Sequence, residues 1–140
     1  MELTNAIEFA RGTKNSVLTA LRRDGRPQLS NVLHVIDEAG DILISITADR
    51  AKYHNLRRTP WAALHVTSPD FRSYVVLECD VTLTEVATDP HAPGIDALVT
   101  YYRTAAGEHP DWEDYRRAMV ADRRVLARLI PTRAYGLLPS

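Results

Sequence analysis

The sequence has little cysteine, little net charge and no long apolar run. Its single cysteine, Cys79, excludes an intramolecular disulfide and removes the commonest zinc-site patterns. The chain has 17 Lys and Arg residues against 18 Asp and Glu residues, a formal net charge of -1. No global field therefore gathers nucleic acid or anionic lipid. No stretch approaches the roughly 20 apolar residues that span a bilayer, and residues 1–5 lack the basic region of a secretion signal. These absences predict a cytoplasmic protein with no nucleic-acid or membrane partner.

The length and the histidine pattern narrow the possibilities further. A chain of 140 residues with 45% hydrophobic content is long enough for one ordinary core, so we expect a single domain over residues 1–140. The histidines are scattered without metal-ligand spacing, and we expect no metal site; they are His34, His54, His65, His91 and His109. Cys79 lies in an alternating strand pattern, which predicts an inert packed thiol.

Hydrophobic periodicity predicts strands in the first half of the chain and helices in a later insert. Thr4 and Asp49 are the expected N-caps of two short helices, and Trp112, Tyr115 and Met119 form an apolar helical stripe. The expected strands cover residues 16–23, 28–36, 41–47, 61–67, 73–84, 124–130 and 134–137, and the expected helices cover 4–11, 50–58, 95–106 and 111–123. This pattern predicts a mainly β (α+β) fold, a closed or half-closed barrel with short helices at its margin.

A first motif follows the turn at Asp24-Gly25, which is typical of a hairpin. The strand after this turn is apolar on both faces at its far end, yet it begins with the polar side chains of Gln28, Ser30 and Asn31. These polar residues predict a rim or a pocket. They are equally compatible with a hairpin edge whose side chains bond backbone or solvent.

A second motif, Arg50 to Pro60, places two cations at the start of a short helix. A helix N-terminus offers unpaired backbone N–H groups, so a phosphate held there also gains from Arg50 and Lys52. Asn55 lies near the same helix face as Lys52, whereas Arg57 and Arg58 fit a solvated C-terminal end. The alternative is a surface helix whose charges lie in water.

Together the two motifs resemble the split β-barrel flavin-binding family that includes pyridoxamine-phosphate-oxidase-like proteins. The resemblance is closest to the actinobacterial branch that uses the deazaflavin coenzyme F420, with its D-G-R-P-Q-L-S-N and R-A-K-x-x-N-L-R-R-x-P patterns. Residues 24–31 and 50–60 match these patterns, and the likeness extends to Ser73-Tyr74 and to the insert 101–124. It spans nearly the whole chain.

The resemblance implies a set of cofactor-binding residues and a homodimer. The phosphate would be held at Arg50, Ala51, Lys52 and Asn55, the ring would be bordered by Gln28, Ser30 and Asn31, and Ser73 and Tyr74 would lie nearby, in some cases across a dimer interface. Phe71-Arg72 departs from the loop of some relatives. Residues 134–137 lack the substrate motif of the pyridoxamine phosphate oxidases, which argues against vitamin B6 oxidation.

The function implied is hydride transfer from reduced F420 to a conjugated small-molecule acceptor of the quinone, enone, lactone or tetrapyrrole type. Tyr74 is the one candidate for a catalytic proton donor. Two alternatives stay open. The same fold could hold FMN as a flavoprotein reductase or oxidase, because the phosphate grip does not distinguish the two cofactors, or the protein could be a deazaflavin carrier without catalysis.

Overall fold

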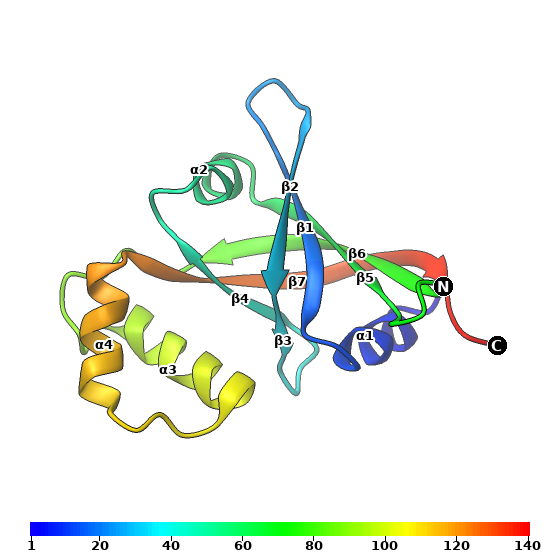
Figure 1. Cartoon of the computed structure of the whole chain (residues 1–140). Coiled ribbons are helices and arrows are strands. Elements are labelled where there is room, and N and C mark those ends of the chain that lie inside the picture. The colour runs from blue at the N-terminus through cyan, green and yellow to red at the C-terminus, as the bar shows by residue number, and fades with distance from the viewer.

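Seven antiparallel strands form a single sheet in the computed structural model, which describes residues 1–140 (Figure 1). The strands are β1 (Asn15–Leu21), β2 (Pro27–Leu33), β3 (Val35–Ile36), β4 (Ile42–Thr47), β5 (Trp61–Thr67), β6 (Tyr74–Leu83) and β7 (Arg124–Leu137), in the spatial order β2-β1-β5-β6-β7-β4-β3. The helices are α1 (Leu3–Arg11), α2 (Ala51–Arg58), α3 (Pro93–Ala106) and α4 (Trp112–Ala121).

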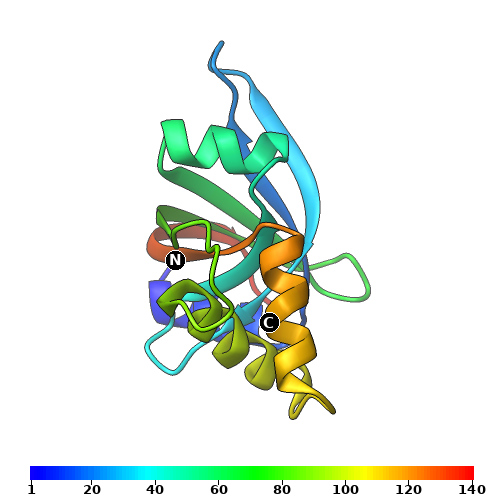
Figure 2. The same ribbon diagram turned by 90° about the vertical axis from the view of Figure 1, so that its left-hand side faces the viewer.

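The sheet curls, so that β2 at one edge contacts β4 near the other. The helices lie outside it: α2 is beside the β1–β2 hairpin, α1 is near both termini, and α3 and α4 cross one side (Figures 1 and 2). Gly25 adopts a φ of 84° in the hairpin turn, a conformation that glycine reaches without strain. The predicted mainly β, half-closed barrel with short helices at its margin is confirmed.

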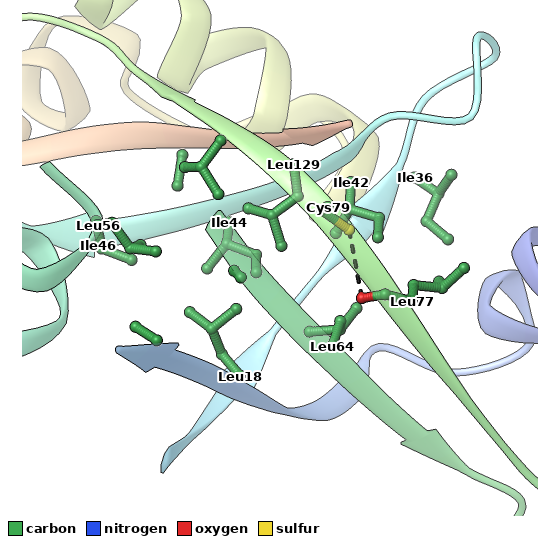
Figure 3. Close-up of a cluster of buried hydrophobic side chains, with 14 of the residues drawn as sticks. Leu18, Ile36, Ile42, Ile44, Ile46, Leu56, Leu64, Leu77, Cys79 and Leu129 are labelled. Carbon is green, nitrogen blue, oxygen red and sulfur yellow. Dashed lines mark hydrogen bonds between the residues drawn. The ribbon is translucent and has the colours of Figure 1, made fainter. Parts of the chain in front are cut away.

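Aliphatic side chains from β1, β4, β5, β6 and β7 fill the inside of the barrel (Figure 3). Leu18, Leu64 and Leu77 stand in register on β1, β5 and β6, and each is at most 1% exposed. Burying one such side chain stabilises the fold by about 1.5–3 kcal/mol. Cys79 is fully buried beside them, and its Sγ lies 3.4 Å from the Leu77 carbonyl oxygen. Burial raises the pKa of this thiol to about 12, so the predicted packed thiol is confirmed.

Strands β6 and β7 form a hairpin whose connection, residues 84–123, contains α3 and α4. We call this connection the insert. A second apolar cluster holds the insert against the outside of β3, β4 and β7; it consists of Val35, Leu43, Ile95, Leu98, Val99, Tyr115 and Leu126. Trp112, Met119 and Val120 pack against this cluster, which confirms the predicted apolar stripe.

Four local predictions are wrong. Helix α1 begins at Leu3 with Glu2 as its N-cap, not Thr4. The N-cap of α2 is Arg50, not Asp49, and no side chain caps this helix. The predicted strand 28–36 is interrupted at His34, and residues 35–36 pair with β4. The two predicted C-terminal strands are one continuous strand, of which residues 124–129 pair with β4 and residues 127–137 pair with β6.

Candidate functional site

The N-terminus of α2 carries positive charge that no protein group neutralises. Its backbone N–H groups have no side-chain cap, and neither Arg50 nor Lys52 forms an ion pair. Lys52 is half-buried. Burial lowers its pKa, and the neighbouring cations Arg124 and Arg50 lower it further. Like charges gathered without a counter-ion, beside the positive end of a helix dipole, constitute a site for an anion.

Arg124 joins this site from a distant part of the sequence. It begins β7 and pairs with Thr47 at the end of β4, just before α2. Its Nη1 donates to the Ser45 carbonyl oxygen at 3.3 Å, and with Lys52 it lines a hollow of about 430 Å³. Our sequence analysis gave Arg124 no role. The strand register that brings it beside Lys52 was the missing information.

The insert supplies the opposite wall of this hollow. The wall consists of Tyr101, Tyr102, Tyr115 and Met119, with Asp122 also lining the hollow. Burial raises the pKa of Tyr101, while the Ser45 backbone and the Arg124 guanidinium act in the opposite direction. The hollow therefore has a cationic end and an aromatic side.

A second hollow, of about 400 Å³, adjoins the first along β2. The two share Asn31, Val32 and Leu33 as lining residues, and the second continues to His65 and Thr67. We call the pair the groove. Strand register places Asn31, Val17 and His65 in one row on the outer face of the sheet. The ring of His65 lies 5.5 Å from that of Tyr74, between centroids. The groove thus runs from Lys52, past Asn31, to the neighbourhood of Tyr74.

Gln28 and Ser30 lie on the other face of β2. Ser30 pairs with the buried Leu18 and points to the inside of the barrel, where its Oγ is buried without a hydrogen-bond partner. Gln28 accepts a bond from Asn55 Nδ2 at 3.4 Å, which ties β2 to α2. Strand alternation therefore separates these two residues from Asn31, and the three do not line one hollow.

Arg58 and Ser73 have structural contacts that the sequence did not reveal. Arg58 Nη2 donates to Asn55 Oδ1 at 2.8 Å and to the Leu21 carbonyl oxygen at 3.0 Å, which corrects its assignment to a merely solvated helix end. Ser73 is buried, and its backbone N–H donates to Ser68 Oγ at 3.0 Å in the β5–β6 loop. Ser73 does not line the groove, and Ala51 is exposed at the start of α2.

His34 is buried, and both ring nitrogens are engaged. Nε2 lies 3.0 Å from the Ala10 carbonyl oxygen and therefore donates to it, while Nδ1 accepts from Ser16 Oγ at 2.7 Å. Burial lowers the pKa of His34. No group of three His, Cys, Asp or Glu side chains is arranged to hold a metal ion. None of the four helices is both long enough and apolar enough to cross a membrane.

The sequence of this chain matches one known protein family over most of its length. The family model described as pyridoxamine 5'-phosphate oxidase matches residues 4–136. This chain belongs to that family. The family includes oxidoreductases and flavin-binding proteins.

Three solved structures of this fold illustrate its range. A conserved hypothetical protein from Mycobacterium tuberculosis is 21% identical, with a TM-score of 0.74 over 100% of this chain and 90% of that one. An F420 reductase is 25% identical, with a TM-score of 0.62 over 91% and 94%. A pyridoxamine 5'-phosphate oxidase-related, FMN binding protein from Nostoc punctiforme is 14% identical, with a TM-score of 0.61 over 96% and 78%. Heme-binding proteins share the fold as well.

The residues of the groove suit a phosphorylated flavin or deazaflavin. The uncapped N-terminus of α2 and its unpaired cations match a phosphate. The groove continues away from this charged end along the outer face of β2. Ser30 Oγ, a buried polar atom without a hydrogen-bond partner, points to the inside of the barrel and does not line the groove.

Proposed function

We propose that this chain is a cytoplasmic oxidoreductase that uses reduced coenzyme F420 to deliver a hydride to a conjugated organic acceptor, such as a quinone, an enone or lactone, or a tetrapyrrole. The observation that carries the proposal is the group of unpaired cations at the uncapped start of α2, where the groove begins. The match of residues 24–31 and 50–60 to the F420 patterns favours the deazaflavin, as does the 25% identity to an F420 reductase.

In this proposal the protein's residues bind and orient, while the cofactor supplies the hydride when it is bound. Arg50, Lys52 and the N–H groups of α2 hold the phosphate. Asn31 and the outer face of β2 support the ring, and the groove limits the access of water. Reduction of the acceptor requires one hydride and one proton. Tyr74, beside His65 at the far end of the groove, is the proposed proton donor.

Replacement of Tyr74 by Phe tests this role. We expect a lower turnover number on an accepted substrate with unchanged cofactor affinity, because the phenol would act only after binding. Turnover equal to that of the original protein would assign the proton to solvent.

FMN is the alternative cofactor, because the solved structures of this fold include an FMN binding protein of the same family. FMN presents a phosphate monoester where F420 has a phosphodiester, and both can bind the same cations, so the presence of these cations does not by itself identify the cofactor. A non-catalytic deazaflavin carrier is the third reading, since binding alone requires only the groove.

Parallel titrations separate these readings. Purified protein is titrated with oxidised F420, FMN and hemin, and fluorescence or absorbance gives each dissociation constant. We expect the tightest binding for F420, followed by oxidation of reduced F420 when a conjugated acceptor is added. Preference for FMN would replace the cofactor, binding without turnover on any acceptor would favour the carrier, and binding of hemin alone would contradict the proposal.

The double variant Arg50→Ala/Lys52→Ala tests the phosphate assignment. Loss of two charge-assisted contacts should weaken cofactor binding by about 2–5 kcal/mol, because each contact contributes about 1.5–3 kcal/mol before solvent compensation. Arg57→Ala is the matched control, since this exposed arginine lies in the last turn of the same helix. Unchanged affinity in the double variant would refute the assignment.

We also propose a homodimer through the outer face of the sheet. Large apolar side chains are exposed there, at 52–61% of their surface; they are Leu29, Leu33, Tyr135 and Leu137. Burial against a second copy would cover them and one side of the groove. Light scattering should give twice the mass of the chain, and Leu33→Glu should give a monomer. A monomeric original protein at micromolar concentration would contradict the dimer.

A further inference from the structure

Three cations from two elements lie near one another at the start of α2, where Lys52 and Arg124 line the groove, and none of them has a carboxylate partner. Arg50 precedes α2, Lys52 lies in its first turn, and Arg124 opens β7. Arginines elsewhere in the chain do form ion pairs, for example Arg128 with Asp37 and Asp41. Asp122 also lines the hollow but pairs with none of the three. A singly charged ligand would leave part of this positive charge uncompensated.

The position of Arg124 is fixed by the barrel. Its backbone is paired with Thr47 in the β4–β7 ladder, and its guanidinium donates to the Ser45 carbonyl oxygen. Nη1 makes this hydrogen bond, and the other N–H groups of the Arg124 guanidinium remain available to donate to a ligand. Lys52 and Tyr101, both much earlier in the sequence, line the same hollow as Arg124. Arg124 therefore lies where α2, the sheet and the insert meet.

We propose that Arg124 is the third cationic ligand of the phosphate group, and that the Tyr101 side of the insert closes the phosphate end of the groove. The inference rests on the proposed function, because the phosphate that Arg124 would bind is that of the cofactor proposed above. It extends the predicted site from one helix to three elements. The phosphate monoester of FMN has a charge of about −1.5 to −2 near neutral pH, and F420 combines a singly charged phosphodiester with the carboxylates of its glutamate tail. Either ligand therefore brings more than one negative charge to the three cations. The planar fork of an arginine also matches phosphate oxygens.

Inorganic phosphate tests this inference without any cofactor. The backbone amide shifts of residues 51–53 are followed by NMR during titration with phosphate against chloride at equal ionic strength. We expect saturable shifts in the original protein and at least about tenfold weaker affinity in Arg124→Gln. The glutamine amide can still donate to the Ser45 carbonyl oxygen, so the local fold has a substitute contact.

Arg123→Gln is the matched control. Arg123 is the adjacent arginine, but it lines a different hollow, with His54 and Arg57, on another side of α2. We expect its phosphate affinity to stay within about twofold of the original. Original protein that does not bind phosphate, equal affinity in Arg124→Gln, or an equal loss in both variants would overturn the inference.

A second pair of titrations separates this inference from the proposed function. Each variant is titrated with FMN and with riboflavin, which differ only in the phosphate. Arg124→Gln should weaken FMN binding about tenfold and riboflavin binding by less than about twofold. Equal losses for both ligands would overturn the role of Arg124. Phosphate-dependent behaviour without any deazaflavin turnover would retain Arg124 and reject the proposed function.

Discussion

The barrel and the insert are stabilised by different kinds of contact. The barrel core has 21 buried residues, which are nearly all aliphatic and belong mostly to hydrogen-bonded strands. The insert cluster has seven buried residues, and three of them come from the sheet on which the insert lies. Its outer part is aromatic: Tyr102 packs edge-on against Tyr115 at 5.0 Å and Trp112 at 5.7 Å, and Arg103 stacks on Trp112 at 4.8 Å.

The barrel and the insert therefore have different structural roles. Close aliphatic packing across a β-ladder gives a rigid scaffold that fixes Lys52, Asn31 and Arg124 relative to one another. The insert depends on the scaffold for its own core, yet it presents Tyr101 and Met119 to the groove. We therefore expect damage to the barrel to unfold the whole chain and damage to the insert to remain local.

The largest effect is expected from Leu77→Ala in the barrel core. Leu77 is fully buried, and removal of its side chain should cost about 2–5 kcal/mol in the free energy of unfolding. Chemical denaturation with probes in both regions should show one shifted transition. Arg23→Ala, at an exposed side chain in the β1–β2 turn, is the control and should change stability by less than about 0.5 kcal/mol. Separate unfolding transitions for the barrel and the insert in Leu77→Ala would contradict the expectation that damage to the barrel unfolds the whole chain.

A smaller effect is expected from Asp111→Ala at the start of α4. The Asp111 carboxylate accepts from the Asp114 backbone N–H at 3.1 Å, so its loss should cost about 1 kcal/mol. Hydrogen exchange should accelerate in α4, while the amides of β5 and β6 keep their protection. Glu113→Ala, at an exposed neighbour in the first turn of the same helix, is the control. Faster exchange in the barrel would show that the two regions unfold together.

The smallest effect is expected from the pH dependence of stability that His34 contributes. Burial lowers the pKa of His34 from its ordinary value of 6.5, although its bond to the Ala10 carbonyl oxygen opposes this shift. Below about pH 6.5 the unfolded chain takes up a proton that the folded chain resists, so stability falls as the pH falls towards the lowered pKa. Thermal unfolding from pH 7.5 to 5 should show this dependence, and His34→Gln should flatten it. A slope unchanged in His34→Gln would assign the pH dependence to another group.

Local patterns were enough to predict most of the fold. Alternating apolar residues identified the strands, Asp24-Gly25 identified the hairpin, and the spacing of Trp112, Tyr115 and Met119 identified a packed helix face. The break at His34 could not be predicted. It depends on a ring that bonds Ser16 and the Ala10 carbonyl oxygen, which are distant in sequence.

The candidate site was only partly predictable for the same reason. The cations of Arg50 and Lys52 are visible in one short motif, and the structure does gather them at an uncapped helix start. Arg124 was missed because only the β4–β7 register brings it to that position. Strand alternation places Ser30 and Asn31 on opposite faces of β2. Which of these faces becomes the inside of the barrel depends on how the whole sheet curls.

The connection between β6 and β7 has an evolutionary consequence. Leu83 pairs directly with Ala127, so the insert leaves the barrel and returns to it at neighbouring points of one hairpin. Mutations that lengthen, shorten or replace residues 84–123 can therefore be tolerated without a change in strand order. Lineages with this barrel can therefore exchange the aromatic wall that shares a hollow with Lys52 and Arg124, while the sheet and the cationic start of α2 stay unchanged.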